Sequence, residues 1–136
     1  SALTNLFLTI ILIKSIGLIG AYIATIIALF IKWYGKFYYV LGGIVSNYTG
    51  LINYYGTWYY LQSGSVKWDY TSLVEHSDGA WYYVEKGILN WNYNGLVEYY
   101  GTLYYIQNGY LNWGYSGRIW YNGKWYKIVN GVAQKD

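Results

Sequence analysis

The sequence predicts a mainly β protein, built as an array of about five stacked β-hairpin repeats with a period of about 22 residues and preceded by one long hydrophobic α-helix. Two observations carry this prediction. An aromatic phrase recurs along most of the chain, and the N-terminal segment before it is strongly apolar and unrelated to it. We therefore expect residues 1–32 to form the helix and residues 33–136 to form the β-hairpin repeat domain.

Composition excludes several classes of function. Of the 136 residues, 55% are hydrophobic and 24% aromatic, whereas only 11% are charged, so the chain does not have the composition of a disordered protein. It contains no cysteine, which excludes disulfides and thiolate chemistry. One histidine and six carboxylates leave little material for a metal site, and a net charge of +3 without a basic run does not favour nucleic-acid binding. We expect no metal, no cofactor and no nucleic-acid partner.

Residues 6–31 are apolar on every side. A helix of about 26 residues would extend about 39 Å, which is enough to cross a bilayer core of about 30 Å. Lys14 is costly near the centre of a bilayer, so either the span begins after it or the helix packs against protein. Small residues four apart, as at Gly17 and Ala21, permit close helix packing. The segment predicts a membrane anchor or a filament core, with self-association into a homo-oligomer.

A glycine opens each copy of the aromatic phrase, and a second glycine follows eight residues later. The phrase reads GTWYYLQSGSV from Gly56, GAWYYVEKGIL from Gly79 and GTLYYIQNGYL from Gly101, with looser copies from Gly35 and Gly123. The spacings are 21, 23, 22 and 22 residues. A fixed period in this range indicates units that stack on one another, and degenerate first and last copies are typical of capping units.

Each copy is predicted to be a β-hairpin. Its second glycine follows a turn-forming residue, as in Asn108-Gly109, and Asn-Gly favours the two-residue type I′ turn. That turn places an aliphatic pair and then a Tyr–Trp pair on one face, which we interpret as the core. A further apolar run, as at Leu51-Ile52, is expected to be a link or a third strand. The predicted pairs are Leu61–Val66 with Tyr59–Trp68, Val84–Leu89 with Tyr82–Trp91, and Ile106–Leu111 with Tyr104–Trp113.

The opposite face of the hairpins is predicted to carry aromatic side chains among polar ones. Such rings can stack on sugars, and they attract organic cations. The same rings could instead pack against the adjacent hairpin or a neighbouring subunit, and both interpretations fit the pattern. The candidate ligand-binding residues on this face are Trp58, Tyr60, Trp81, Tyr83, Tyr105 and Trp125.

The phrase WYYV-x-x-G, at a period of about 22 residues and followed by a short connector, resembles the aromatic cell-wall-binding repeats of Gram-positive surface proteins. These include choline-binding and glucan-binding repeats and the repeat regions of large clostridial toxins. The resemblance covers about residues 33–131 and implies a β-hairpin solenoid that binds wall polymer or glycan in grooves between repeats. Those families usually carry Gly-Trp at the start of the connector, where the Trp helps to build a choline cage. Here the corresponding pairs are Gly50-Leu51, Ser72-Leu73, Gly95-Leu96 and Gly117-Arg118.

Together these features predict a non-enzymatic protein at the cell surface or outside the cell, anchored by its helix and binding cell-wall or extracellular polysaccharide. His76 lies between Glu75 and Asp78 in a one-residue insertion and is interpreted as a solvated loop residue, so we predict no catalytic site. The alternative is a subunit of an extracellular filament. An apolar N-terminal helix before a small β domain looks like the layout of type IV pilin-like subunits, in which the helices form the core and the β domains the outer surface.

Overall fold

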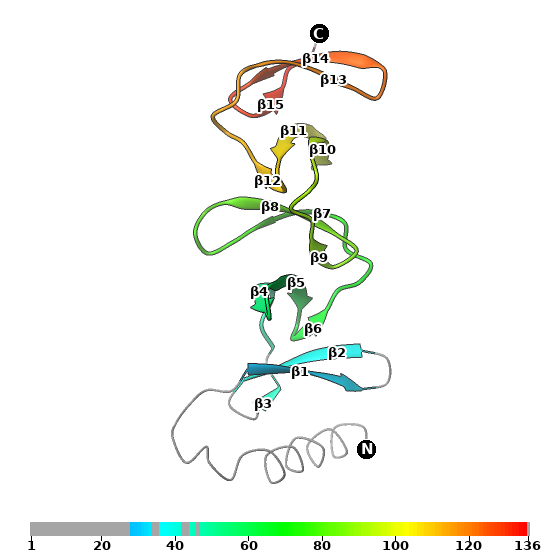
Figure 1. Ribbon diagram of the computed structural model, residues 1–136, viewed down its shortest axis with the longest axis vertical. Coiled ribbons are helices and arrows are strands. Elements are labelled where there is room, and N and C mark those ends of the chain that lie inside the picture. The colour runs from blue at the N-terminus through cyan, green and yellow to red at the C-terminus, as the bar shows by residue number, and fades with distance from the viewer. Residues whose placement is uncertain (1–27, 34–35, 42–43, 46, 136) are drawn as a thin grey trace. The chain divides into compact units, whose positions relative to one another are not determined.

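The computed structural model describes residues 28–33, 36–41, 44–45 and 47–135 of the chain. These residues form fifteen β-strands with antiparallel pairing, which confirms the mainly β prediction (Figure 1). No helix among them is long and apolar enough to cross a membrane. Most of the helix predicted for residues 1–32 lies outside the described residues.

The helix predicted for residues 1–32 is wrong for its last five residues. Strand β1 (Ala28–Trp33) pairs along its whole length with β2 (Lys36–Leu41), from Ala28 opposite Leu41 to Trp33 opposite Lys36. Both runs contain aromatic and β-branched residues, which favour extended backbone when a partner strand is at hand. Residues 28–32 therefore belong to the first hairpin and not to the hydrophobic segment that precedes it.

The described chain divides into two units, and the first contains this hairpin. Within it, β2 also pairs with β3 (Ile44–Val45) and meets β6 (Ser65–Val66) where Tyr38 lies opposite Ser65. Strand β6 pairs in turn with the end of β5 (Thr57–Gln62), with Leu61 opposite Val66 as predicted.

The second unit contains most of the complete repeats, except for residues 61–66 of the first. Each complete repeat has three strands: a connector strand, an aromatic strand and a two-residue strand. The connector strands pair with the aromatic strands, so the short apolar runs are third strands and not mere links. The connector strands are β4 (Gly50–Tyr54), β7 (Ser72–Glu75), β10 (Gly95–Tyr99) and β13 (Gly117–Tyr121). The aromatic strands are β5 and its equivalents β8 (Trp81–Glu85), β11 (Thr102–Gln107) and β14 (Lys124–Val129). The two-residue strands are β6 and its equivalents β9 (Ile88–Leu89), β12 (Tyr110–Leu111) and β15 (Val132–Ala133).

Two tight turns shape most repeats. The turn predicted at Asn108-Gly109 is confirmed, because both residues have positive φ (50° and 77°), as a type I′ turn requires. A second turn of the same kind joins the connector strand to the aromatic strand. In the third repeat it is formed by Tyr100 (φ 48°) and Gly101 (φ 79°), a pair that turn preferences do not predict because tyrosine is uncommon at positive φ.

The second glycine of each repeat docks that repeat on the one before it. The backbone N–H of Gly87 donates to the carbonyl of Tyr70 (2.9 Å), and its own carbonyl accepts from the N–H of Tyr60 (2.8 Å). A Cβ atom at Gly87 would lie 2.8 Å from the carbonyl oxygen of Lys67, so the position needs glycine for space as well as for its positive φ. Gly109 and Gly131 repeat the arrangement with Tyr93 and Tyr83, and with Tyr115 and Tyr105.

The core lies between successive repeats and is aliphatic at its centre. One cluster contains Leu51, Val74, Val84 and Leu89, and the other is centred on Ile106. The predicted aliphatic pairs are thus confirmed as core. Adjacent residues of β8 point to opposite faces of the strand, and both Tyr83 and Val84 are buried, so both faces of the aromatic strand are covered.

The tryptophans of the predicted Tyr–Trp core pairs are not buried. Trp68, Trp91 and Trp113 are 39%, 46% and 48% exposed. The predicted register would have placed them in the core had the hairpin ladder continued. It stops after two residue pairs, because the chain turns at Asn90, where the N–H of Tyr93 donates to the Asn90 carbonyl (3.3 Å). The tryptophans therefore lie on turns at the surface.

Candidate functional site

Each of three successive repeats presents an exposed tryptophan against a half-buried tyrosine. The rings of Tyr82 and Trp91 meet edge to face, with centroids 5.7 Å apart and planes at 78°. This geometry is the favoured one for an aromatic pair, and it leaves much of the indole surface open to solvent. We call these pairs the Tyr–Trp corners. The other two are Tyr59–Trp68 (6.1 Å, 88°) and Tyr104–Trp113 (5.8 Å, 79°).

Local polar contacts fix the turns that carry these tryptophans. The side chain of Asn90 accepts a hydrogen bond from the N–H of Asn92 (3.0 Å), and its amide donates to Glu85 (2.9 Å), so the turn bearing Trp91 is tied at two points. Asn112 repeats the pattern around Trp113, with the N–H of Gly114 and the side chain of Gln107 as partners. Such side-chain bonds hold a turn in one conformation before any ligand arrives.

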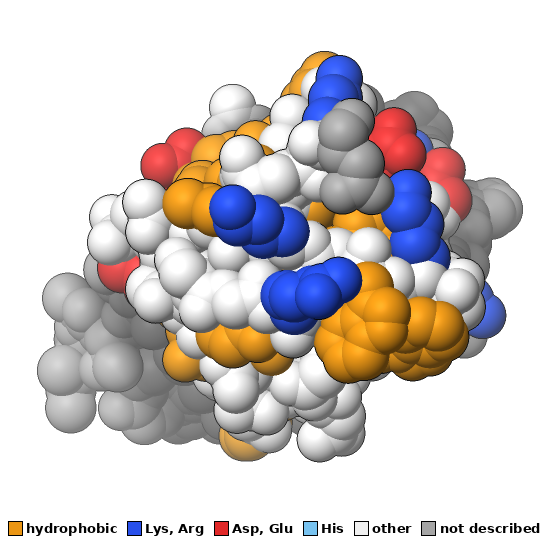
Figure 2. All heavy atoms as spheres, turned by 90° about the horizontal axis from the view of Figure 1, so that it is seen from above, with side chains coloured by type: hydrophobic (Ala, Val, Ile, Leu, Met, Phe, Trp, Pro, Cys, Tyr) orange, Lys and Arg blue, Asp and Glu red, His pale blue; other side chains and the backbone are white. Residues whose placement is uncertain are grey.

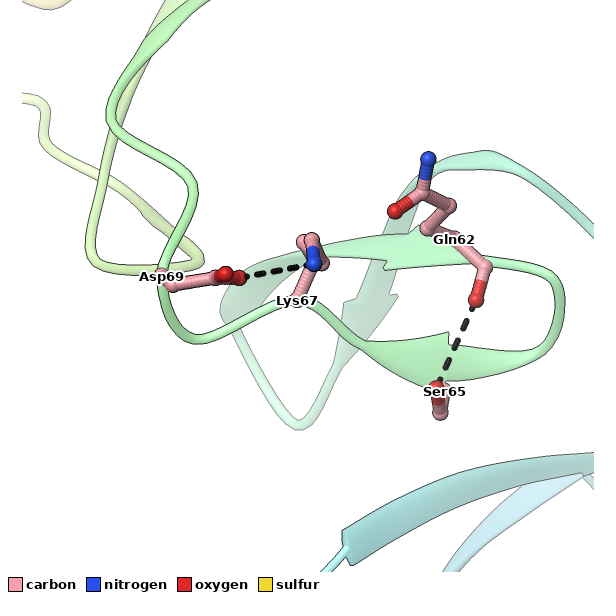
Figure 3. A network of polar contacts seen from close by, with 4 residues as sticks. All are labelled: Gln62, Ser65, Lys67 and Asp69. Carbon is pink, nitrogen blue, oxygen red and sulfur yellow. Dashed lines mark hydrogen bonds and ion pairs between the residues drawn. The ribbon is translucent and has the colours of Figure 1, made fainter.

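Trp68 is flanked by the charged residues Lys67 and Asp69, and Lys67 stands where the other two turns have asparagine. Lys67 Nζ lies 3.1 Å from Asp69 Oδ1, and the hydrogen bond from Lys67 lowers the pKa of the Asp69 carboxyl (Figure 3). This ion pair is largely exposed, so water and salt screen it and it adds little to stability. Figure 3 also shows the turn of the β5–β6 hairpin, where Ser65 Oγ donates to the carbonyl of Gln62 (3.4 Å).

Trp58 and Trp81, which the sequence analysis proposed as ligand contacts, are half-buried between consecutive repeats. Trp81 meets Tyr99 of the next connector strand edge-on (5.2 Å, 68°). Trp58 meets His76 in the same way (5.3 Å, 80°), because His76 occupies the position equivalent to Tyr99. Both indoles also pack against the aliphatic clusters, so they help to join repeats while part of each remains accessible.

Tyr60, Tyr83 and Tyr105 pack inside the array. Their rings lie 4.3, 4.1 and 4.4 Å from those of Tyr70, Tyr93 and Tyr115. The prediction that Tyr83 lies on an exposed outer face is wrong, because only 7% of it is accessible. The partner tyrosines tie each repeat to the next by donating from their hydroxyls to the carbonyls of Leu73 (2.7 Å), Leu96 (2.8 Å) and Arg118 (3.3 Å).

Trp125 is 52% exposed, as its predicted place on the outer face requires, and it meets Trp120 edge-on (5.4 Å). Its ring already has a cation beside it, because the guanidinium carbon of Arg118 lies 5.5 Å from the ring centroid. Lys124 Nζ lies 5.2 Å from the ring of Tyr126 in the same hairpin. Figure 2 shows Lys and Arg side chains beside hydrophobic ones on one face of the molecule. In this repeat, cationic side chains of the chain itself therefore already lie against two of the aromatic rings.

His76 is not the solvated loop residue that the sequence suggested. It is half-buried, with Trp58 on one side and Tyr82 on the other (6.2 Å between ring centroids). Asp78 accepts from the N–H of Ala80 (2.8 Å) and from the hydroxyl of Tyr82 (2.9 Å), and these bonds lower the pKa of its carboxyl. Asp78 therefore shapes the loop and does not orient the imidazole. Among the described residues, no group of three or more potential metal ligands occurs.

The connector positions that carry tryptophan in the resembling families are part of the core here. Leu51, Leu73 and Leu96 are only 1–2% exposed. A ligand cage that needs a tryptophan at this position therefore has no counterpart in these repeats. The tryptophan of each Tyr–Trp corner belongs to a different sequence motif, Trp-x-Tyr. This motif begins two residues after a buried aliphatic residue of the hairpin, and its tryptophan was predicted to lie in the core. It occurs as WDY, WNY and WGY, beginning at Trp68, Trp91 and Trp113.

Two comparisons find known proteins or families to which the chain is similar. The family model for the choline-binding repeat matches residues 47–67, 69–90 and 92–112. Among solved structures, the chain is similar to that of CbpF in complex with ipratropium, with 28% sequence identity and a TM-score of 0.38, over 79% of this chain and 33% of that one. The chain thus spans about one third of CbpF. A comparison with curated proteins finds no match. These three ranges match the model for the choline-binding repeat in tandem, and the resemblance of this part of the chain to aromatic cell-wall-binding repeats is confirmed.

Proposed function

We propose that the repeat region is a non-catalytic module that holds the protein on cell-wall polymer or extracellular polysaccharide through its exposed aromatic side chains. Choline-binding repeats indicate a cell-surface or extracellular protein that binds choline or carbohydrate. The observation that supports the proposal best is the set of three equivalent Tyr–Trp corners, each with a tryptophan 39–48% exposed. Exposed aromatic surface that recurs in this way is typical of an interaction site.

Repetition compensates for weak single sites. Each corner offers one indole and one phenol ring, enough to stack on a sugar ring or to attract a cationic group. A polymer that engages several corners binds each further one intramolecularly, which raises its overall affinity by orders of magnitude. The fixed turns around Trp91 and Trp113 lower the cost of ordering the site.

We propose that the ligand contacts include Trp58, Trp81 and Trp125, which the sequence predicts, together with Trp68, Trp91 and Trp113. Tyr60, Tyr83 and Tyr105 are assigned to packing. Anchoring by the apolar N-terminal segment and formation of a homo-oligomer stay predictions, since that segment lies outside the described residues. The filament alternative depends on the same segment, and the match to choline-binding repeats does not favour it.

The test is sedimentation of the protein with purified Gram-positive cell wall. The double variant Trp91→Ala/Trp113→Ala removes two corners without touching the aliphatic core, and we expect its apparent affinity to fall by roughly tenfold or more. Tyr55→Asn is the matched control, because it removes an exposed aromatic ring that belongs to no Tyr–Trp corner. Wild-type sedimentation of the double variant, or no sedimentation of either protein, contradicts the proposal. Elution by free choline or by soluble wall polysaccharide then distinguishes the two ligand classes.

A further inference from the structure

Three Asn-Gly pairs of the chain form two-residue turns with the same backbone geometry. They are Asn108-Gly109, Asn122-Gly123 and Asn130-Gly131, and in each pair both residues have positive φ (47–50° for asparagine, 74–77° for glycine). A fourth pair, Asn94-Gly95, lies at the start of β10, where the glycine is buried. Because the three turns share their residues and their backbone conformation, they differ only in what surrounds them.

The turn at Asn130-Gly131 is fixed to the preceding repeat through both of its amides. The N–H of Asn130 donates to Ser116 Oγ (2.9 Å), and the N–H of Gly131 donates to the carbonyl of Tyr115 (2.8 Å). Gly131 is buried, and a Cβ atom there would lie 2.6 Å from the carbonyl oxygen of Asn112. The Asn108-Gly109 turn is held by an equivalent pair of hydrogen bonds. Neither turn can open without disturbing a junction between repeats.

The turn at Asn122-Gly123, which joins β13 to β14, has none of these contacts. Both residues are exposed, and within the described part of the chain neither backbone N–H, nor the Asn122 side chain, makes a hydrogen bond. A Cβ atom at Gly123 would have no other atom within 4 Å. The nearest residue pair of the hairpin is Tyr121 opposite Lys124. This turn can therefore open by breaking that pair alone, while every junction between repeats stays intact.

We propose that Asn122 is a site of spontaneous deamidation, a covalent modification that converts its side-chain amide into a carboxylate. The backbone nitrogen of Gly123 loses its proton to solvent and attacks Cγ of Asn122. The new N–Cγ bond closes a five-membered imide, while the Cγ–Nδ2 bond breaks and the amide nitrogen takes up a proton and leaves as ammonia. Water then opens the imide at one of its two carbonyls, which gives aspartate or isoaspartate. One water is consumed and one ammonia is released, and no oxidant or reductant takes part.

Glycine makes the attack possible, and the surroundings of each glycine set its rate. Without a Cβ, glycine does not hinder the approach of its own nitrogen to the asparagine side chain, and its backbone leaves the turn conformation easily. An N–H that donates to a carbonyl must first break that hydrogen bond before the nitrogen can lose its proton and rotate toward the side chain. Gly109 and Gly131 carry this restraint, whereas Gly123 does not. The same dipeptide is thus protected in two turns and open to reaction in the third.

Deamidation changes both the charge and the backbone of the last hairpin. Either product adds a negative charge at position 122, beside Lys124. Isoaspartate also inserts one extra methylene into the main chain, for which a two-residue type I′ turn has no room. Trp120 and Trp125 lie directly opposite each other, one residue pair further from the turn, so the altered backbone disturbs their pairing. An effect on wall binding through Trp125 rests on the proposed function, whereas the chemistry at Asn122 does not.

The experiment is incubation of the full chain at mildly alkaline pH, with samples digested by trypsin over several days and analysed by mass spectrometry. Digestion in heavy-oxygen water labels any deamidation that occurs during the digestion itself. Trypsin cleaves after lysine and arginine, so residues 119–124 and 128–135 are released as separate peptides with one Asn-Gly pair each. We expect Asn122 to be converted roughly tenfold or more faster than Asn130, because two further hydrogen bonds must break before the turn at Asn130 can open.

Two controls separate the fold from the local sequence. In concentrated urea the contacts of both turns are lost, and the two rates should become similar. Ser116→Ala removes the partner of the Asn130 N–H and should speed conversion of Asn130 by roughly two- to tenfold, with no change at Asn122. Equal rates in the folded chain, the same ratio in urea, or an Asn122 that stays intact while the unfolded chain is converted would each overturn the proposal. None of these measurements involves cell wall, so such a result would leave the proposed function standing.

Discussion

The backbone N–H of Gly109 donates to the carbonyl of Tyr93 across a distance of 3.0 Å, and this contact joins the third repeat to the second. A Cβ atom at Gly109 would lie 2.5 Å from the carbonyl oxygen of Asn90, which is backbone and cannot move aside cheaply. Gly101 in the other turn of the same repeat has the same positive φ but no atom within 4 Å of such a Cβ.

These two glycines predict different costs for the same substitution. Gly101→Ala should lower the free energy of unfolding by about 1–2 kcal/mol, through backbone strain alone. Gly109→Ala adds a clash with the preceding repeat and should cost about 3 kcal/mol or more. Urea denaturation of the two variants measures the difference. Equal losses would show that φ, and not space, is the reason for glycine at position 109.

The positions of Ile106 and Trp91 predict that the smaller residue matters more for stability. Ile106 is fully buried, and Ile106→Ala should cost about 2–5 kcal/mol. Trp91 is 46% exposed, so Trp91→Ala should cost less, about 1–2 kcal/mol, although it removes more atoms. Chemical denaturation of both variants decides the order. The reverse order would return Trp91 to the core.

Stability should fall at alkaline pH because of Tyr70. Burial raises the pKa of Tyr70 from 10.0 to about 12, since the phenolate loses its solvation in this position. A pKa that is raised on folding gives stability that is complete below pH 10 and is lost as the pH rises towards 12. We expect the midpoint urea concentration to decline over this window. In Tyr70→Phe the decline should be shallower, whereas stability at pH 7 should already be lower because the hydrogen bond to Leu73 is gone.

The loop of the second repeat should loosen when Asp78 is removed. Its carboxylate holds the N–H of Ala80 and the hydroxyl of Tyr82, so Asp78→Ala frees both donors. Hydrogen exchange at the Ala80 amide should become faster, while exchange at the amides of β11 should not change. Asp69→Ala is the control, because that carboxylate contacts Lys67 outside this loop. Unchanged exchange at Ala80 in Asp78→Ala would show that other contacts define the loop.

The sequence predicted the features that depend on local chemistry. The Asn108-Gly109 turn and the aliphatic pair Ile106–Leu111 follow from turn preference and from alternation along a strand, and both are confirmed. The turn at Tyr100-Gly101 was missed because tyrosine is a poor choice for positive φ, so no residue preference announced it.

The sites were harder to predict, because their exposure depends on where the strands stop. Trp91 was assigned to the core by extending the hairpin ladder two residues beyond Leu89. A turn ends that ladder, in which the N–H of Tyr93 donates to the Asn90 carbonyl. The Asn90 side chain supports this turn by accepting the N–H of Asn92, and strand alternation takes no account of either contact. In the same way, residues 28–31 continue the apolar pattern of the segment before them, but pairing with β2 makes them a strand.

The glycine contact between neighbouring repeats has a consequence for how such a protein can change over evolutionary time. Each repeat recognises backbone carbonyl and amide groups of the one before it, and backbone is the same whatever side chains surround it. Duplication or deletion of one unit of about 22 residues would therefore regenerate the same junction at the splice. The number of repeats can then change with gene length, while the side chains of each copy remain free to diverge.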